Sequence, residues 1–254
     1  MYLALLVIVP LVACFSKALS LSWDQFVAAV WTPRAIAAYS FSIGASLVSS
    51  LASIVLGFLI AWVLVRYEFP LKRVFDALID LPFALPTAVA GLVYSGLYVE
   101  SGWLGQFLVP LGIQAAYSRL AVVLVLTFLG IPFVVRTLEP VLESLEGDKE
   151  EAAFLLGANR WQTFCRVIFP PLTPALITGF ALSMARGLGE YGSVVFVSAN
   201  LPFKTEIAPR LIVERLEDFH YAEATAIAVV LLIISFTMLV LINLLERWSN
   251  RYYA

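Results

Sequence analysis

The sequence predicts an all-α membrane protein with six transmembrane helices. Of its 254 residues, 61% are hydrophobic and 13% are charged, about half of the roughly 25% charged residues that soluble domains contain. The charged residues also leave six long apolar runs, several of them close to the roughly 20 residues that a bilayer-spanning helix needs. The 14 Gly and 13 Pro are spread among these runs, which membrane helices tolerate because neighbouring groups satisfy the backbone.

The six runs are the expected spans, at residues 1–16, 35–65, 81–99, 120–135, 167–185 and 224–245. No internal repeat, low-complexity segment or second domain is evident, so residues 1–254 are expected to form one transmembrane domain. The first run is short and no basic residue precedes it, which argues against a signal peptide. Either Lys17 snorkels beyond a longer span, or the protein begins upstream.

Basic residues indicate how the chain crosses the membrane. With the N-terminus inside, nine of the 16 Lys and Arg fall in inner segments and six in outer segments, while Arg186 lies within an apolar stretch. This modest bias favours both termini in the cytoplasm. The polar segment between the fourth and fifth spans is then cytoplasmic.

Composition also argues against several classes of protein. A formal net charge of −2 provides no basic surface for nucleic acid. Cys14 and Cys165 are expected at opposite faces, where no disulfide joins them, and the single His220 has no clustered ligands for a metal. A membrane-embedded hydrolase would need a nucleophile and base at one depth, and no HExxH occurs. We therefore expect no catalytic residue and no cofactor in this chain.

The segment between spans four and five reads as two helices joined by a glycine. Residues 150–156 are helix formers with acidic residues in the first turn, where the helix dipole favours them. Gly157 offers a stop, and Asn159 can cap a second helix from Arg160 to about Val167. Pro170 and Pro171 are expected to end this helix and to begin the next span.

The two-helix segment carries four large apolar side chains, at Phe154, Leu155, Leu156 and Trp161. An exposed apolar patch of this kind indicates a partner. The alternative is an amphipathic loop that packs on its own helices.

This segment resembles the EAA loop of ABC importer permeases, EAA-x3-G-x9-I-x-L-P. Glu151-Ala152-Ala153 is followed by three residues, Gly157, nine residues and Val167-Ile168-Phe169-Pro170, with Val and Phe replacing Ile and Leu. The resemblance implies the type I permease fold and a coupling loop at about residues 140–171 that docks on an ATPase subunit. The implied coupling residues are Glu151, Ala152, Ala153, Leu156, Gly157, Trp161 and Pro170. No phosphate-binding GxxxxGK[ST] motif is present, so a partner is expected to bind ATP and Mg²⁺.

Three further stretches resemble the T-type permease subunit of sulfate and thiosulfate importers. They are DLPFALPTAVAG at 80–91, IPFVVRT at 131–137 and RGLGEYGSVVF at 186–196. Because molybdate and tungstate permeases carry related versions of the last stretch, they are the alternative. A passive channel is a further alternative that would not explain the EAA loop.

The resemblance implies several partners. They are two ATPase subunits, a second permease subunit of the W type and a periplasmic sulfate-binding protein. The implied location is the bacterial inner membrane, with a plastid membrane as the alternative.

Four residues are candidates for a translocation path or gate. Pro86 and Thr87 can break a helix at membrane depth and free carbonyls toward a path, or can mark a packing kink. Arg186 and Glu190 lie four residues apart and, on one helix, would share a face. They either gate a divalent anion or form an ion pair that fixes a dimer interface. The GLGEYG sequence at 187–192 follows no strand, so a dinucleotide fold is not expected.

Overall fold

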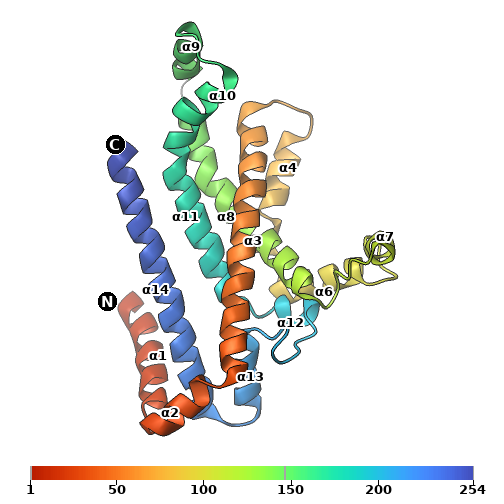
Figure 1. Cartoon of the computed structure of the whole chain (residues 1–254), viewed down its shortest axis with the longest axis vertical. Coiled ribbons are helices and arrows are strands. Elements are labelled where there is room, and N and C mark those ends of the chain that lie inside the picture. The colour runs from red at the N-terminus through yellow and green to blue at the C-terminus, as the bar shows by residue number, and fades with distance from the viewer. Residues whose placement is uncertain (1, 146, 254) are drawn as a thin grey trace. The chain divides into compact units, whose positions relative to one another are not determined.

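The chain folds into helices joined by short connections (Figure 1). The structure, a computed structural model, describes residues 2–145 and 147–253. The α-helices are α1 (Tyr2–Ala18), α2 (Trp23–Val30), α3 (Pro33–Arg66), α4 (Lys72–Ile79), α5 (Leu81–Ala84), α6 (Thr87–Tyr98), α7 (Gly105–Leu108), α8 (Arg119–Ser144), α9 (Gly147–Leu155), α10 (Arg160–Thr163), α11 (Phe169–Leu188), α12 (Val194–Val197), α13 (Ala208–Glu217) and α14 (Tyr221–Tyr253). A 3₁₀ turn at Val109–Leu111 and a π-helical turn at Phe164–Ile168 complete the set. The all-α prediction is confirmed: no strand occurs in the described ranges.

Within the described residues, four helices are long and apolar enough to cross a membrane. They are Pro33–Arg66, Arg119–Ser144, Arg160–Leu188 and Tyr221–Glu246. A bent pair, Leu5–Ala18 with Trp23–Val30, makes a fifth candidate if it is counted as one span, and the chain bends by 106° between its two arms. Ser22 begins the second arm with a capping box: it accepts from the Gln25 amide, and Gln25 accepts in return.

The structure does not confirm the expected number of six spans. The run at 81–99 is divided into α5 and α6, because Leu85 is extended and Pro86 follows it. The residue before a proline is driven out of helical conformation, and proline itself offers no amide hydrogen. Helix α6 has 12 residues and is therefore about 18 Å long, short of the roughly 30 Å hydrocarbon core.

The helices of the fifth span also differ from expectation. Pro170 and Pro171 do not interrupt the chain, which continues as helix from α10 through the π-helical turn into α11. Both prolines lie in the first turn of α11, just after the π-helical turn. Proline has no amide hydrogen to donate, and it is tolerated there because the hydrogen bonds just before it are of the π type. The predicted second helix from Arg160 to about Val167 is thus the start of a span.

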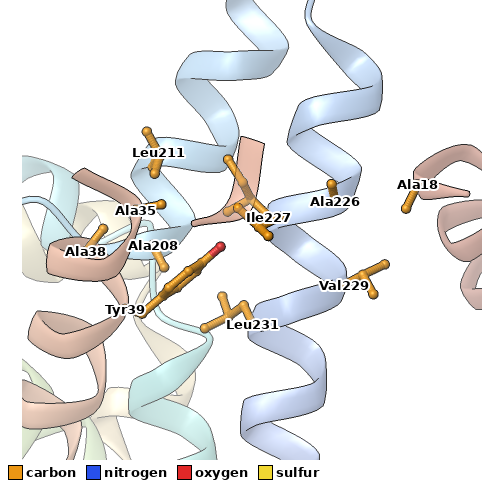
Figure 2. Close-up of a cluster of buried hydrophobic side chains, with 11 residues drawn as sticks. Ala18, Ala35, Ala38, Tyr39, Ala208, Leu211, Ala226, Ile227, Val229 and Leu231 are labelled. Carbon is orange, nitrogen blue, oxygen red and sulfur yellow. The ribbon is translucent and has the colours of Figure 1, made fainter. Parts of the chain in front are cut away.

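The described chain divides into two compact units, each assembled from separate segments. The first runs up to Ala45 and adds Thr87–Val125 and Leu188–Thr237; the second contains Ser46–Pro86, Leu126–Gly187 and the chain from Met238 onward. The core of the first unit packs α14 against α3 and α13. Figure 2 shows the Tyr39 ring pointing toward Ile227 and Leu231 of α14. Small side chains such as Ala35 and Ala208 let these helices approach closely.

An arginine at the start of α3 fastens α13 to this core. Arg34 donates from Nε to Glu206 at 2.8 Å and from Nη2 to Glu206 and Glu214, both at 2.6 Å. Glu206 is only 2% exposed, so its carboxylate depends on this partner. The Arg34 guanidinium lowers the pKa of Glu214. The contribution of the Arg34–Glu214 pair to stability is present at pH values above the usual carboxyl pKa. This contribution is lost as the pH falls through the lowered pKa of Glu214.

We predict that Arg34→Ala destabilises the first unit by about 2 kcal/mol, because it leaves the buried Glu206 carboxylate without its cation. The midpoint of thermal unfolding in detergent should fall by roughly 5 °C. The control is Arg210→Ala, which removes a pair to Glu217 whose side chain is 61% exposed; it should cost less than about 1 kcal/mol. Equal losses in the two variants would contradict the buried-carboxylate argument.

Candidate functional site

The segment from α9 to α10 is a tight elbow whose backbone is closed by its own hydrogen bonds. Helix α9 ends in a Schellman motif: the Ala158 amide donates to the Ala153 carbonyl at 3.0 Å, and the Gly157 amide donates to Phe154 at 2.9 Å. Gly157 has a φ of +83°, which side-chain-bearing residues rarely adopt. The turn itself therefore favours glycine at this position.

The second arm of the elbow begins with a reciprocal cap. The Asn159 side chain accepts from the Gln162 amide at 2.9 Å, and the Gln162 side chain accepts from the Asn159 amide at 2.9 Å. These two bonds satisfy donors that a helix start leaves open. The stop at Gly157 and the cap at Asn159 were both expected from the sequence, and both are confirmed.

The apolar side chains of the elbow are exposed. Phe154 is 76%, Leu155 84%, Leu156 89% and Trp161 72% exposed. Glu151 and Ala152 are also exposed, and Ala153 and Pro170 are half-buried. The alternative in which the elbow packs these four side chains on its own helices is therefore wrong. Four exposed large apolar side chains on one short segment are characteristic of a binding surface.

Aromatic packing connects the elbow to the end of α3. The Phe164 ring lies 5.9 Å from Trp161 and from Phe169, 6.0 Å from Trp62 and 6.1 Å from Phe58, measured between ring centroids. Such edge and stacked pairs add about 0.5–1.5 kcal/mol each beyond their burial. A force on Trp161 therefore reaches both α11 and α3 through one side chain.

An ion pair holds the first arm of the elbow to the same helix end. Arg66, the last residue of α3, donates from Nη2 to the Glu150 carboxylate on α9. Its guanidinium also lies over the Trp62 ring, 5.1 Å from the centroid, a favourable cation–π arrangement. Both arms of the elbow are thus attached to α3.

The candidate path residues fall on either side of the Pro86 break. Thr87 begins α6 in the first unit, where a Cβ added to Gly192 would lie 2.1 Å from the Thr87 hydroxyl. The turn that follows α11 therefore packs directly on the start of α6. Pro86 is exposed, and its break leaves Leu85 extended, as the sequence indicated.

Arg186 and Glu190 do not share one helix. Helix α11 ends at Leu188, so Glu190 lies beyond it, and the expectation that both occupy one helical face is wrong. Glu190 is 3% exposed and accepts hydrogen bonds from the Ser193 amide and hydroxyl, both at 2.8 Å. Arg186 is part-buried near the end of α11.

A clasp centred on Arg136 was not assigned from the sequence. Arg136 of α8 binds Asp80 with two nitrogens at 2.7 and 2.9 Å, and it reaches Asp76 and Glu139 at 2.7 Å. It thereby fastens α4 and α5, just before the Pro86 break, to a long span. The signal available in the sequence is the pair of aspartates four residues apart on the helix that precedes the break.

No cluster of His, Cys, Asp and Glu that could hold a metal ion occurs within the residues whose positions are described. The chemistry at the elbow and at the break is that of packing and charge pairing.

Residues 53–253 match the family model of the binding-protein-dependent transport system inner membrane component. The chain belongs to this family. The matched range contains the elbow, the Arg136 clasp and the Pro86 break. The family assignment, the all-α fold and the membrane-spanning helices agree with the resemblance found in the EAA motif.

Curated relatives are similar over nearly the whole chain. The sulfate transport system permease protein CysT of Synechocystis is 51% identical, with 99% of this chain and 88% of the relative covered. The CysT protein of Escherichia coli is 44% identical, with 99% and 91% covered. The probable sulfate transport system permease of Nephroselmis olivacea is 49% identical, with 100% and 89% covered.

Solved structures share the fold at low sequence identity. A bacterial ABC transporter that imports the acidic polysaccharide alginate has a TM-score of 0.79 at 18% identity, covering 97% of this chain and 91% of that one. The MetNI methionine ABC transporter, in an inward-facing conformation, has a TM-score of 0.62 at 17% identity, covering 90% and 99%. These likenesses establish an ABC importer permease fold.

We predict that Gly157→Ala loosens the elbow and that Gly157→Asn does so much less. An alanine at φ +83° costs about 1 kcal/mol, whereas asparagine adopts this conformation more readily. Nothing lies within 4 Å of an added Cβ at this site, so the cost is purely one of backbone conformation. Hydrogen exchange at residues 157 and 158 should accelerate about five-fold in the alanine variant. Equal acceleration in both variants would contradict this.

Proposed function

We propose that this chain is the membrane-spanning permease subunit of an ATP-driven importer that moves sulfate or thiosulfate inward. The observation that carries the proposal is 44–51% identity, over almost the whole chain, to permeases named for sulfate transport. The fold neighbours are ABC importers. Their own substrates, alginate and methionine, differ from sulfate, so the fold does not select the anion.

The elbow is the surface by which the ATPase would drive the permease. Two ATPase subunits bind and hydrolyse ATP with Mg²⁺, and one receives the elbow of this chain. The four exposed apolar side chains seat in a groove of that subunit, with Glu151, Ala152, Ala153, Leu156, Gly157, Trp161 and Pro170 as the coupling residues. Closure of the ATPases would then pull on Phe164 and tilt α11 and α3 together.

The Pro86 break and the turn after α11 form the path in this proposal. Thr87 begins the helix that the turn packs against, and Glu190 holds that turn through Ser193. Glu190 is therefore a positioning residue, and Arg186 supplies the positive charge that a divalent anion meets. The anion reaches the path from a periplasmic sulfate-binding protein and passes between this chain and a W-type permease subunit.

The other partners follow from the type of importer. One fold neighbour is an alginate ABC transporter in complex with a ligand-bound periplasmic protein, which supports delivery from outside. The complex lies in the bacterial inner membrane, or in the corresponding plastid membrane, with both termini of this chain in the cytoplasm.

We predict that cells lacking sulfate transport take up radiolabelled sulfate when they express this chain with its neighbouring subunits. Excess unlabelled thiosulfate should compete, because both divalent anions would use the same path, and molybdate should not. The control is the same operon without this chain, which should give background uptake. If sulfate uptake is absent and molybdate-dependent growth is rescued, the substrate is molybdate or tungstate.

We predict that Gly157→Trp uncouples the complex. The indole would project from the exposed elbow and block its docking in the groove of the ATPase subunit. Uptake should therefore fall at least about ten-fold, while insertion in the membrane is unchanged. The matched control is Gly157→Asn, which retains the turn and should retain most uptake. Uptake at the normal rate by the tryptophan variant would count against docking of the elbow.

We predict that Arg186→Ala impairs sulfate uptake about ten-fold or more, as expected for losing a charged contact in the path, while the complex purifies with its normal subunits. Arg186→Lys, which keeps the charge, should restore part of the activity. Dissociation of the complex in the alanine variant would instead identify Arg186 as a structural residue.

A further inference from the structure

Two adjoining grooves in the second unit differ sharply in polarity. The polar groove, of about 750 Å³, lies at the end of α3 and is lined by charged residues of α4 and α8. The apolar groove, of about 540 Å³, is lined almost entirely by aliphatic and aromatic side chains of α3, α4 and α8. Leu64 and Phe69 line both grooves, so the two adjoin.

The order of the grooves along α3 follows the polarity of a membrane. Leu59, Ile60 and Val63 of the apolar groove belong to the candidate span Pro33–Arg66. The charged lining begins past the last residue of that span, at Glu68 and Lys72. Hydrocarbon therefore faces the apolar groove, and the headgroup region faces the polar groove. An amphiphile that stands in the bilayer encounters the same sequence of environments.

Most charges of the polar groove are already paired. Arg136 is held by Asp76, Asp80 and Glu139, and Lys72 pairs with Glu68. Arg73 and Glu143 form no hydrogen bond or ion pair among the side chains that the structure describes. One cation and one anion therefore remain in the same groove.

The charge balance selects the headgroup. The lining has four carboxylates, Glu68, Asp76, Glu139 and Glu143, against the three cations Lys72, Arg73 and Arg136. Anionic lipids are recognised by basic pockets, which this is not. A zwitterion with a phosphate for Arg73 and an ammonium for Glu143 matches the two open charges. A primary ammonium has three N–H donors for carboxylates, which a quaternary amine lacks.

We propose that the two grooves together bind one phospholipid whose headgroup carries a phosphate and a primary amine, with an acyl chain in the apolar groove. The lipid would lie against α4 beside the Arg136 clasp, which holds the segment before the Pro86 break. Its removal would loosen that segment.

The test measures which lipid stays with the purified permease complex. The complex, with its partner subunits, is reconstituted in vesicles of equimolar phosphatidylethanolamine, phosphatidylglycerol and phosphatidylcholine, extracted in mild detergent, and its retained lipids are quantified by mass spectrometry. Phosphatidylethanolamine should be enriched. The double variant Arg73→Gln/Glu143→Gln should lower its retention about ten-fold, through loss of two charge-assisted hydrogen bonds. Equal retention of all three lipids would overturn the proposal.

Matched variants separate the site from general effects. Lys17→Gln/Glu100→Gln removes the same charges at exposed positions outside the grooves and should leave retention unchanged. Val63→Trp should fill the apolar groove and lower retention, whereas Val55→Trp, exposed on the same helix outside the groove, should not. A photo-crosslinker at position 63 should label lipid. If it labels another protein chain instead, the groove is a subunit interface and the lipid proposal is wrong.

Discussion

In a bilayer, every backbone amide and carbonyl must find its partner within the protein, and this constraint governs the architecture of the chain. The long helices Pro33–Arg66, Arg119–Ser144, Arg160–Leu188 and Tyr221–Glu246 meet it along their length. The extended Leu85 before Pro86 departs from it and is placed beside a clasped segment. The elbow also departs from helical geometry, but it closes its own hydrogen bonds.

Charge pairing at the ends of the spans places the short elements. Arg34 at the start of α3 holds α13, Arg66 at its other end holds α9, and Arg136 of α8 holds α4. Each arginine has a long side chain that reaches away from hydrocarbon toward polar partners. The same device therefore attaches three separate surface helices, and each attachment depends on very few side chains.

The sequence predicted what depends on local chemistry. Composition indicated an all-α membrane protein, and the EAA motif indicated the elbow, its glycine stop and its asparagine cap.

The sequence did not predict features that depend on tertiary contacts or on competition between neighbouring turns. Pro170 and Pro171 read as a helix boundary because a π-helical turn that admits them has no sequence signal of its own. Glu190 was expected on a helix because its spacing from Arg186 fits one, whereas α11 ends at Leu188, between the two residues. The clasp joins Arg136 to Asp80 and Asp76, which lie 56 and 60 positions earlier in the chain. No local sequence pattern encodes contacts over such a separation.

The backbone of the elbow forms its own hydrogen bonds, and this affects how much of the protein accumulates in the cell. Because the Gly157 turn and the Asn159 cap need no outside donor or acceptor, the elbow can reach its fold as soon as the chain is synthesised. Its four exposed apolar side chains, however, make a chain without its partner prone to aggregation and to recognition by quality control. Under the proposed docking of the elbow on an ATPase subunit, the permease would therefore accumulate only in proportion to that subunit.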